Sequence, residues 1–153
     1  MRRRMVLLFG GALVLIAAAV GWWQSRPRLT DEEKILAVIA EVRAAAEERN
    51  AGRVLRHIDD DYDDGTYKKL DLTRMVVGGF RSPEPWRVQV ELPQVQVTGD
   101  RATAKVRVEV WFAGAGSNSD HVKAKVTADF VKRRGSWKVI RAGGWEPVAT
   151  LGE

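Results

Sequence analysis

Apolar and polar residues alternate with period two through much of the second half of the chain. In residues 101–112 the even positions are apolar and most odd positions are polar, and residues 121–130 repeat this order. No Asp, Glu, His or Tyr occurs at these even positions. Such alternation is typical of half-buried antiparallel strands, which cover one face and leave the other in water. We therefore expect a sheet whose apolar inner face is covered by the segments that precede it.

The apolar positions change from even to odd at Pro93. Val88 and Val90 precede this proline, whereas Val95 and Val97 follow it. Proline cannot donate to a strand ladder, and one extra residue turns the following side chains to the other face. The change therefore predicts a β-bulge or a sharp bend, and with it a strongly curved sheet. Hairpin turns are expected at two places, Gly99-Asp100 and Arg134-Gly135-Ser136.

Three segments with helical periodicity lie between residues 30 and 80. Thr30 and Glu33 have the spacing of a capping box, and apolar residues follow at helical intervals up to Asn50-Ala51-Gly52, where we expect the first helix to end. A short second helix stops in the acidic run DDDYDDG. A third, weaker helical stretch contains Leu72, Met75, Val76 and Phe80, with Gly78-Gly79 near its end and the turn SPEP after it. Three helices followed by an antiparallel sheet predict an α+β fold, with the helices packed on one face.

An uncharged run of 19 residues, from Met5 to Trp23, follows three arginines at the N-terminus. As a helix this run would just cross a hydrocarbon core of about 30 Å. We expect one transmembrane helix that holds the following domain on the extracytoplasmic side of the cell inner membrane. The alternative is a signal peptide cleaved near Ala17-Ala18-Ala19, which would release a secreted domain. In both cases residues 1–28 are the membrane or signal segment and residues 29–153 are the domain.

Charge and composition exclude several classes of function. The formal net charge of +5 comes from residues 1–28, which hold five arginines and no acid, because residues 29–153 hold 20 basic and 20 acidic residues. A neutral domain does not favour nucleic-acid binding. The chain has no cysteine, which excludes disulfides, thiolate metal sites and a cysteine nucleophile. In the acidic run, Tyr62 occupies the third place of a possible calcium loop, so a solvated turn is favoured over a metal site. We expect no metal and no cofactor.

The order of these elements, with the stretches HIDDDYDDGTYKKL and RRGSWKVIRAGGWEP, resembles the nuclear transport factor 2-like superfamily. The resemblance covers about residues 30–147. It implies a cone-shaped, cystatin-like domain with a pocket between helices and curved sheet, and a possible homodimer through the outer sheet face. The superfamily includes isomerase-like and cyclase-like enzymes, transport adaptors and domains without activity. Members with one N-terminal membrane helix are similar to non-catalytic parts of envelope machinery.

The enzymes of this superfamily need an acid or a base inside the cone. Neither histidine fits this role, because His121 falls on the polar face of its strand and His57 lies beside the apolar stripe of the second helix. We therefore assign no catalytic residue. The residues expected to line the pocket are Tyr62, Phe80, Trp86, Val108, Phe112, Val126, Phe130 and Trp145.

Two hypotheses of function follow. The first is a membrane-anchored binding or assembly module of the cell envelope, attached through Met5–Trp23, which binds an apolar small molecule or an envelope protein without chemistry. The second is an isomerase, dehydratase or cyclase that uses the cone pocket, with Asp61 or Asp63 reaching it from the helix end. A carboxylate or imidazole buried beside a cavity would favour the second.

Overall fold

The computed structural model describes residues 28–83, 86–91, 93–112 and 120–147. The helices of this part are α2 (Asp31–Glu47), α3 (Ala51–Arg56) and α4 (Lys69–Gly79). The strands are β1 (Trp86–Val90), β2 (Gln94–Thr98), β3 (Arg101–Phe112), β4 (Asp120–Arg133) and β5 (Ser136–Pro147). None of the described helices has the length and apolar character needed to cross a membrane, and the predicted anchor lies outside the described residues.

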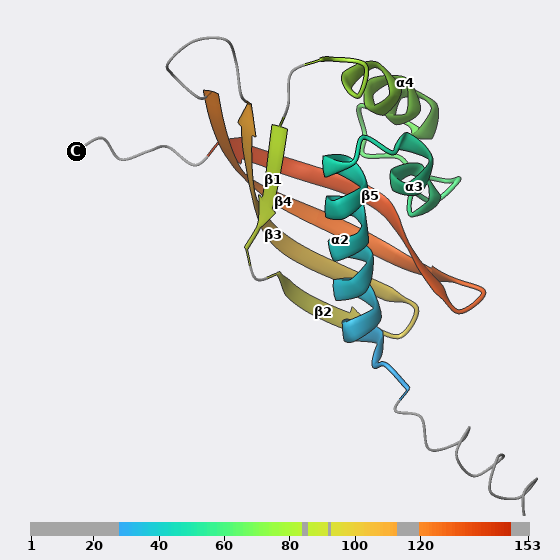
Figure 1. Cartoon of the computed structure of the whole chain (residues 1–153). Coiled ribbons are helices and arrows are strands. Elements are labelled where there is room, and N and C mark those ends of the chain that lie inside the picture. Colours follow the sequence, from blue (N-terminus) through green and yellow to red (C-terminus); the bar gives the residue numbers. More distant parts are fainter. Residues whose placement is uncertain (1–27, 84–85, 92, 113–119, 148–153) are drawn as a thin grey trace, which may run out of the picture.

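The strands form one antiparallel sheet in the order β1-β3-β4-β5, with β2 also paired to β3. Figure 1 shows α2 lying across this curved sheet, with α3 and α4 beyond the C-terminal end of α2. The predicted α+β fold, with helices packed on a curved antiparallel sheet, is therefore confirmed.

The bend predicted at Pro93 is also present. Strand β1 pairs with one half of β3 and β2 with the other half, so both lie on the same edge of β3. Val90 pairs with Val108, an even residue with an even one, whereas Val95 pairs with Ala104, an odd residue with an even one. The change of parity therefore keeps the apolar side chains of both strands on the inner face.

Helix α2 begins as its sequence predicts. The Thr30 hydroxyl accepts a hydrogen bond from the Glu33 N–H at 3.2 Å, and the Glu33 carboxylate accepts one from the Thr30 N–H at 2.7 Å. These two bonds form the capping box and satisfy amide groups that the first turn leaves unpaired.

The predicted end of this helix, at Asn50-Ala51-Gly52, is wrong. Helix α2 ends at Glu47, and Ala51 and Gly52 form the first turn of α3. Arg49 adopts a left-handed conformation (φ 56°) that reverses the chain, and the Asn50 side chain then accepts a hydrogen bond from the Arg53 N–H at 3.0 Å. The asparagine starts the second helix instead of ending the first, because its side chain satisfies an amide of the new helix.

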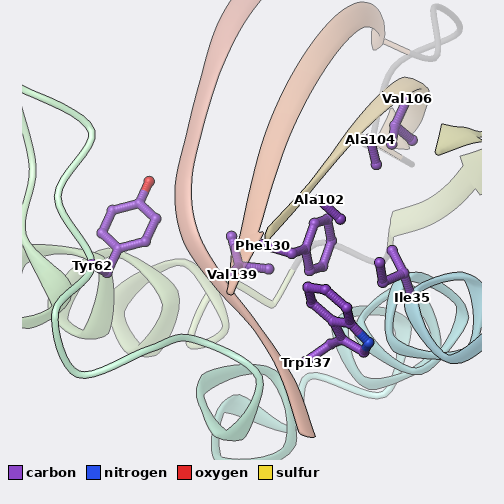
Figure 2. Packing of buried hydrophobic residues seen from close by; sticks show 8 residues of the cluster. All are labelled: Ile35, Tyr62, Ala102, Ala104, Val106, Phe130, Trp137 and Val139. Carbon is purple, nitrogen blue, oxygen red and sulfur yellow. The ribbon is translucent and has the colours of Figure 1, made fainter. Parts of the chain in front are cut away.

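The core lies between α2 and the inner face of the sheet. Small residues on β3 leave space for the helix, and Ala104 is completely buried. In Figure 2 the rings of Phe130 and Trp137 lie next to Ile35 of α2. Together the cluster comprises Ile35, Tyr62, Ala102, Ala104, Val106, Phe130, Trp137 and Val139.

Polar contacts hold both ends of α2 on the sheet. In the first turn, the Asp31 carboxylate accepts hydrogen bonds from Lys132 Nζ at 3.0 Å and from Trp137 Nε1 at 3.2 Å. These donors hold the pKa of Asp31 below its ordinary value. In the last turn, the Ala46 carbonyl accepts from Trp86 Nε1 at 3.0 Å, and the Glu47 carboxylate accepts from the Val88 N–H at 3.2 Å.

Replacing Ile35 by alanine tests the packing of α2. Ile35 has no exposed surface, so Ile35→Ala should lower the free energy of unfolding by about 2–5 kcal/mol, measured by urea denaturation. Leu70→Ala is the matched control, because Leu70 is 60% exposed and its truncation should change stability by less than about 0.5 kcal/mol. Equal losses in the two variants would contradict the core described above.

Candidate functional site

An apolar cavity of about 580 Å³ lies between α3, α4, the loop that joins them, and β5. Its volume is within the range of small-molecule sites, and hydrophobic side chains form most of its wall. Helix α4 is the least anchored part of this wall, since none of its side chains is fully buried and Met75 is 51% exposed. The main apolar lining residues are Val54, Leu55, Ile58, Leu72, Met75, Val76 and Val139.

Tyr62 and Asp64 bring polar groups to this cavity from the loop before α4. The Tyr62 hydroxyl donates a hydrogen bond to Asp64 Oδ2 at 2.9 Å. The other carboxylate oxygen of Asp64 accepts from the N–H groups of Tyr67 at 2.7 Å and Thr66 at 2.8 Å. The Tyr62 phenol and the Asp64 carboxylate are therefore hydrogen-bonded to each other, and the carboxylate is also hydrogen-bonded to the backbone of the loop.

Both groups have shifted pKa values. The hydrogen bond from the Tyr67 N–H lowers the pKa of Asp64. Partial burial acts in the opposite direction, but the other donors add to the lowering, so the pKa lies below its ordinary value. Burial, and then the hydrogen bond to ionised Asp64, raise the pKa of Tyr62 to about 12. At neutral pH the cavity therefore meets a carboxylate and a neutral phenol, and neither titrates there.

The acidic loop folds against the free edge of β5. The Asp59 N–H donates to the Val139 carbonyl at 2.8 Å and the Asp63 N–H to the Ile140 carbonyl at 3.1 Å, so the loop extends the ladder. The Asp63 carboxylate then accepts from the Gly65 N–H at 2.8 Å, which closes a turn typical of aspartate. This pairing covers an edge that would otherwise expose unpaired strand groups.

Arg133 connects two other carboxylates of the loop to β4. Asp59 is only 6% exposed and pairs with Arg133 at 3.2 Å, and Asp61 pairs with the same guanidinium at 2.9 Å. Burial would raise the pKa of Asp59, but the hydrogen bonds from Arg133 and from the Asp61 N–H outweigh it and lower the pKa below its ordinary value. Asp60 pairs with Lys69. Within the described residues, no group of acids and histidines is arranged to hold a metal ion.

Asp61 and Asp63, the acids considered for a catalytic role, do not line the apolar cavity; both border hollows elsewhere on the loop. His57 caps the end of α3, is half-buried and also lies outside the cavity lining. Burial, and then the charge of Lys138, lower the pKa of His57 below its ordinary value. The backbone of His121 pairs opposite Trp111, and its side chain is outside the described part of the structure.

Asp64 is a polar residue of the cavity that the alternation in the strands could not predict, because it lies in a loop. It is half-buried beside the cavity, as the enzyme hypothesis requires of a carboxylate. A signal for it does exist in the sequence: an aspartate two residues before a threonine and two after a tyrosine is suited to an aspartate turn with a nearby phenol. Its hydrogen bonds nevertheless show that it organises this turn.

The residues predicted to line the pocket occupy several places. Tyr62 lines the apolar cavity, Phe130 belongs to the core, and Val108 packs against it. Val126 is buried and borders a separate hollow. The side chain of Trp145 lies outside the described residues. A shared ligand for these residues stays a prediction.

Phe80, Trp86 and Phe112, which were also predicted to line the pocket, form an aromatic cluster. The Trp86 ring meets Phe80 and Phe112 edge to face, with centroid distances of 5.4 and 6.4 Å. The Arg49 guanidinium lies 5.0 Å from the Trp86 ring centroid. This cluster joins the C-terminal ends of α2 and α4 to β1.

No protein-family model and no curated protein matches the sequence. Solved structures do match. A cystatin-like protein of unknown function from Nostoc punctiforme aligns with a TM-score of 0.64 and 17% identity, over 81% of this chain and 97% of its own. A nuclear transport factor 2-like protein of unknown function from Pseudomonas putida gives 0.62 and 17%, over 78% and 94%. The hexachlorocyclohexane dehydrochlorinase LinA-type3 from Novosphingobium barchaimii gives 0.59 and 22%, over 77% and 90%. These similarities show a shared nuclear transport factor 2-like, cystatin-like fold.

Arg133→Gln should make the stability of the domain depend differently on pH. The lowered pKa of Asp59 adds stability above its unfolded value of about 4, and this contribution is lost as the pH falls through the folded value. Without Arg133 the buried carboxylate loses its partner, so the variant should melt at a lower temperature at pH 7. The deficit should shrink below about pH 4, measured by thermal denaturation at several pH values. A deficit that does not change with pH would contradict the ion pair as its cause.

Proposed function

We propose that this domain binds a small apolar molecule in the cavity between α3, α4 and β5 and does not convert it chemically. The observation that carries the proposal is a mostly apolar cavity of about 580 Å³ in which two polar lining residues, Tyr62 and Asp64, already have partners inside the protein. Thr66 and Tyr67 add hydroxyl groups to the same wall. A ligand that makes few hydrogen bonds fits such a wall, because it leaves those bonds intact.

The protonation states of the cavity groups argue against acid–base catalysis. A general acid or base works best when its pKa lies near the operating pH. The pKa of Tyr62 is raised to about 12 and that of Asp64 is lowered, so both shifts move away from neutrality. The dehydrochlorinase with the same fold is an enzyme, but its 22% identity to this chain supports a shared fold and not a shared activity.

We place this binding domain in the cell envelope, on the basis of the uncharged run from Met5 to Trp23. As a membrane helix the run would hold the domain on the extracytoplasmic side. An apolar molecule in that aqueous space is more stable when a protein shields its surface from water. An isomerase, dehydratase or cyclase is the alternative, and in the cavity described above it would have to use Asp64.

Filling the cavity from α4 tests the binding proposal. Val76 lines the cavity and the neighbouring Val77 does not, so Val76→Trp should weaken binding of the neutral fluorophore N-phenyl-1-naphthylamine by about tenfold or more, whereas Val77→Trp should not. The measurement is fluorescence titration of the full-length chain. Both variants should fold, since no side chain of α4 is fully buried. Equal binding by the two variants, or no saturable binding in the parent, would refute the proposal.

The pH dependence of binding provides a second test. Because Asp64 stays ionised and Tyr62 stays neutral, affinity for the same uncharged fluorophore should be constant between about pH 6 and pH 9. A bell-shaped profile that Asp64→Asn abolishes would contradict this expectation and favour the enzyme alternative.

A further inference from the structure

The outer face of the sheet carries complementary pairs across β3 and β4. Lys123 Nζ lies 3.1 Å from a carboxylate oxygen of Glu109, its register partner. Six residues farther along each strand, the Thr103 hydroxyl donates to the Asp129 carboxylate at 2.8 Å. Opposed pairs of this kind stabilise an antiparallel sheet, and neither place carries an excess of positive charge.

Between these two pairs the pattern is reversed. Arg107 stands directly opposite Lys125, so two cations face each other across the strands. Like charges in this position destabilise a sheet. Lys105 lies two residues before Arg107 on β3. Its register partners on β2 and β4, Gln94 and Thr127, are uncharged. Three cations therefore gather on one part of the outer face.

Few negative groups balance these cations. Arg107 pairs with Glu91 at 3.5 Å, and more than half of each side chain is exposed, so this pair contributes little. Within the described part of the chain, no ion pair joins Lys105 or Lys125 to a carboxylate. On its other side, the backbone register places Glu146 of β5 opposite Lys125.

The three cations border a hollow of about 920 Å³. It lies between two irregularities of the sheet: the break that includes Glu91 and Pro93, and the register shift of β5 that includes Gly144. Most of its lining side chains belong to the outer face, so it is distinct from the apolar cavity under α4.

We propose that this hollow binds a soluble small molecule with two or more negative charges, carried by phosphate or carboxylate groups. Such an anion would bridge Lys105, Arg107 and Lys125 and remove the repulsion between the opposed cations. A long acidic peptide fits less well, because Glu109 and Asp129 lie on the same face on either side of the cations. The site does not depend on the apolar ligand proposed above.

The test uses pyrophosphate as the probe and the full-length chain in detergent at low ionic strength. Isothermal titration should show saturable binding, and Lys125→Gln should weaken it by about tenfold or more, as expected for the loss of one charge-assisted hydrogen bond. Lys125→Gln should also raise the melting temperature without pyrophosphate, because it removes the repulsion with Arg107.

Lys123→Gln is the matched control, since it removes the same charge from the same strand but from a complementary pair. It should leave pyrophosphate binding within about twofold and should not raise the melting temperature. Equal weakening by Lys123→Gln and Lys125→Gln would overturn the proposal, as would failure to bind pyrophosphate while a poly-glutamate peptide binds.

Discussion

The fixed position of α2 on the inner face of the sheet is the constraint on which the rest of the domain depends. Alanines on β3 let the helix come close, and Asp31 and Glu47 attach its two ends to opposite parts of the sheet. Arg53 of α3 then binds Glu41 in the middle of α2 at 2.9 and 3.0 Å. The second helix thus takes its place from the first, and the loop that follows takes its place from the edge of β5.

The acidic loop shows how charged residues can build an apolar site. Its carboxylates bind Arg133, Lys69 and loop amides, so each of them has a partner within the protein. The loop holds α3 and α4 apart at the end of β5, and the cavity is the space that remains. The charged groups support the walls and do not point free acids at the interior, and this arrangement supports the binding function proposed above.

The sequence predicted the parts of the structure that repeat. Alternation identified the inner face of β3 and β4, the parity change identified the bend at Pro93, and Thr30 identified the start of α2. It could not predict features that depend on one local conformation. The left-handed Arg49 moved a helix boundary, and the turn around Asp64 placed a carboxylate beside the cavity. The pattern also could not show which apolar residues meet an open space. Phe130 and Tyr62 were therefore assigned to one pocket, although both belong to the core cluster and only Tyr62 also borders the cavity.

The weak anchoring of α4 has a consequence for how this protein changes over evolution. A wall without fully buried side chains contributes little to global stability, so substitutions along its inner side cost the fold little. Such substitutions would change the shape of the cavity and leave the core and the sheet as they are. With the binding function proposed above, one scaffold could acquire new ligand preferences through α4 alone, without crossing the stability threshold that limits substitutions in a packed core.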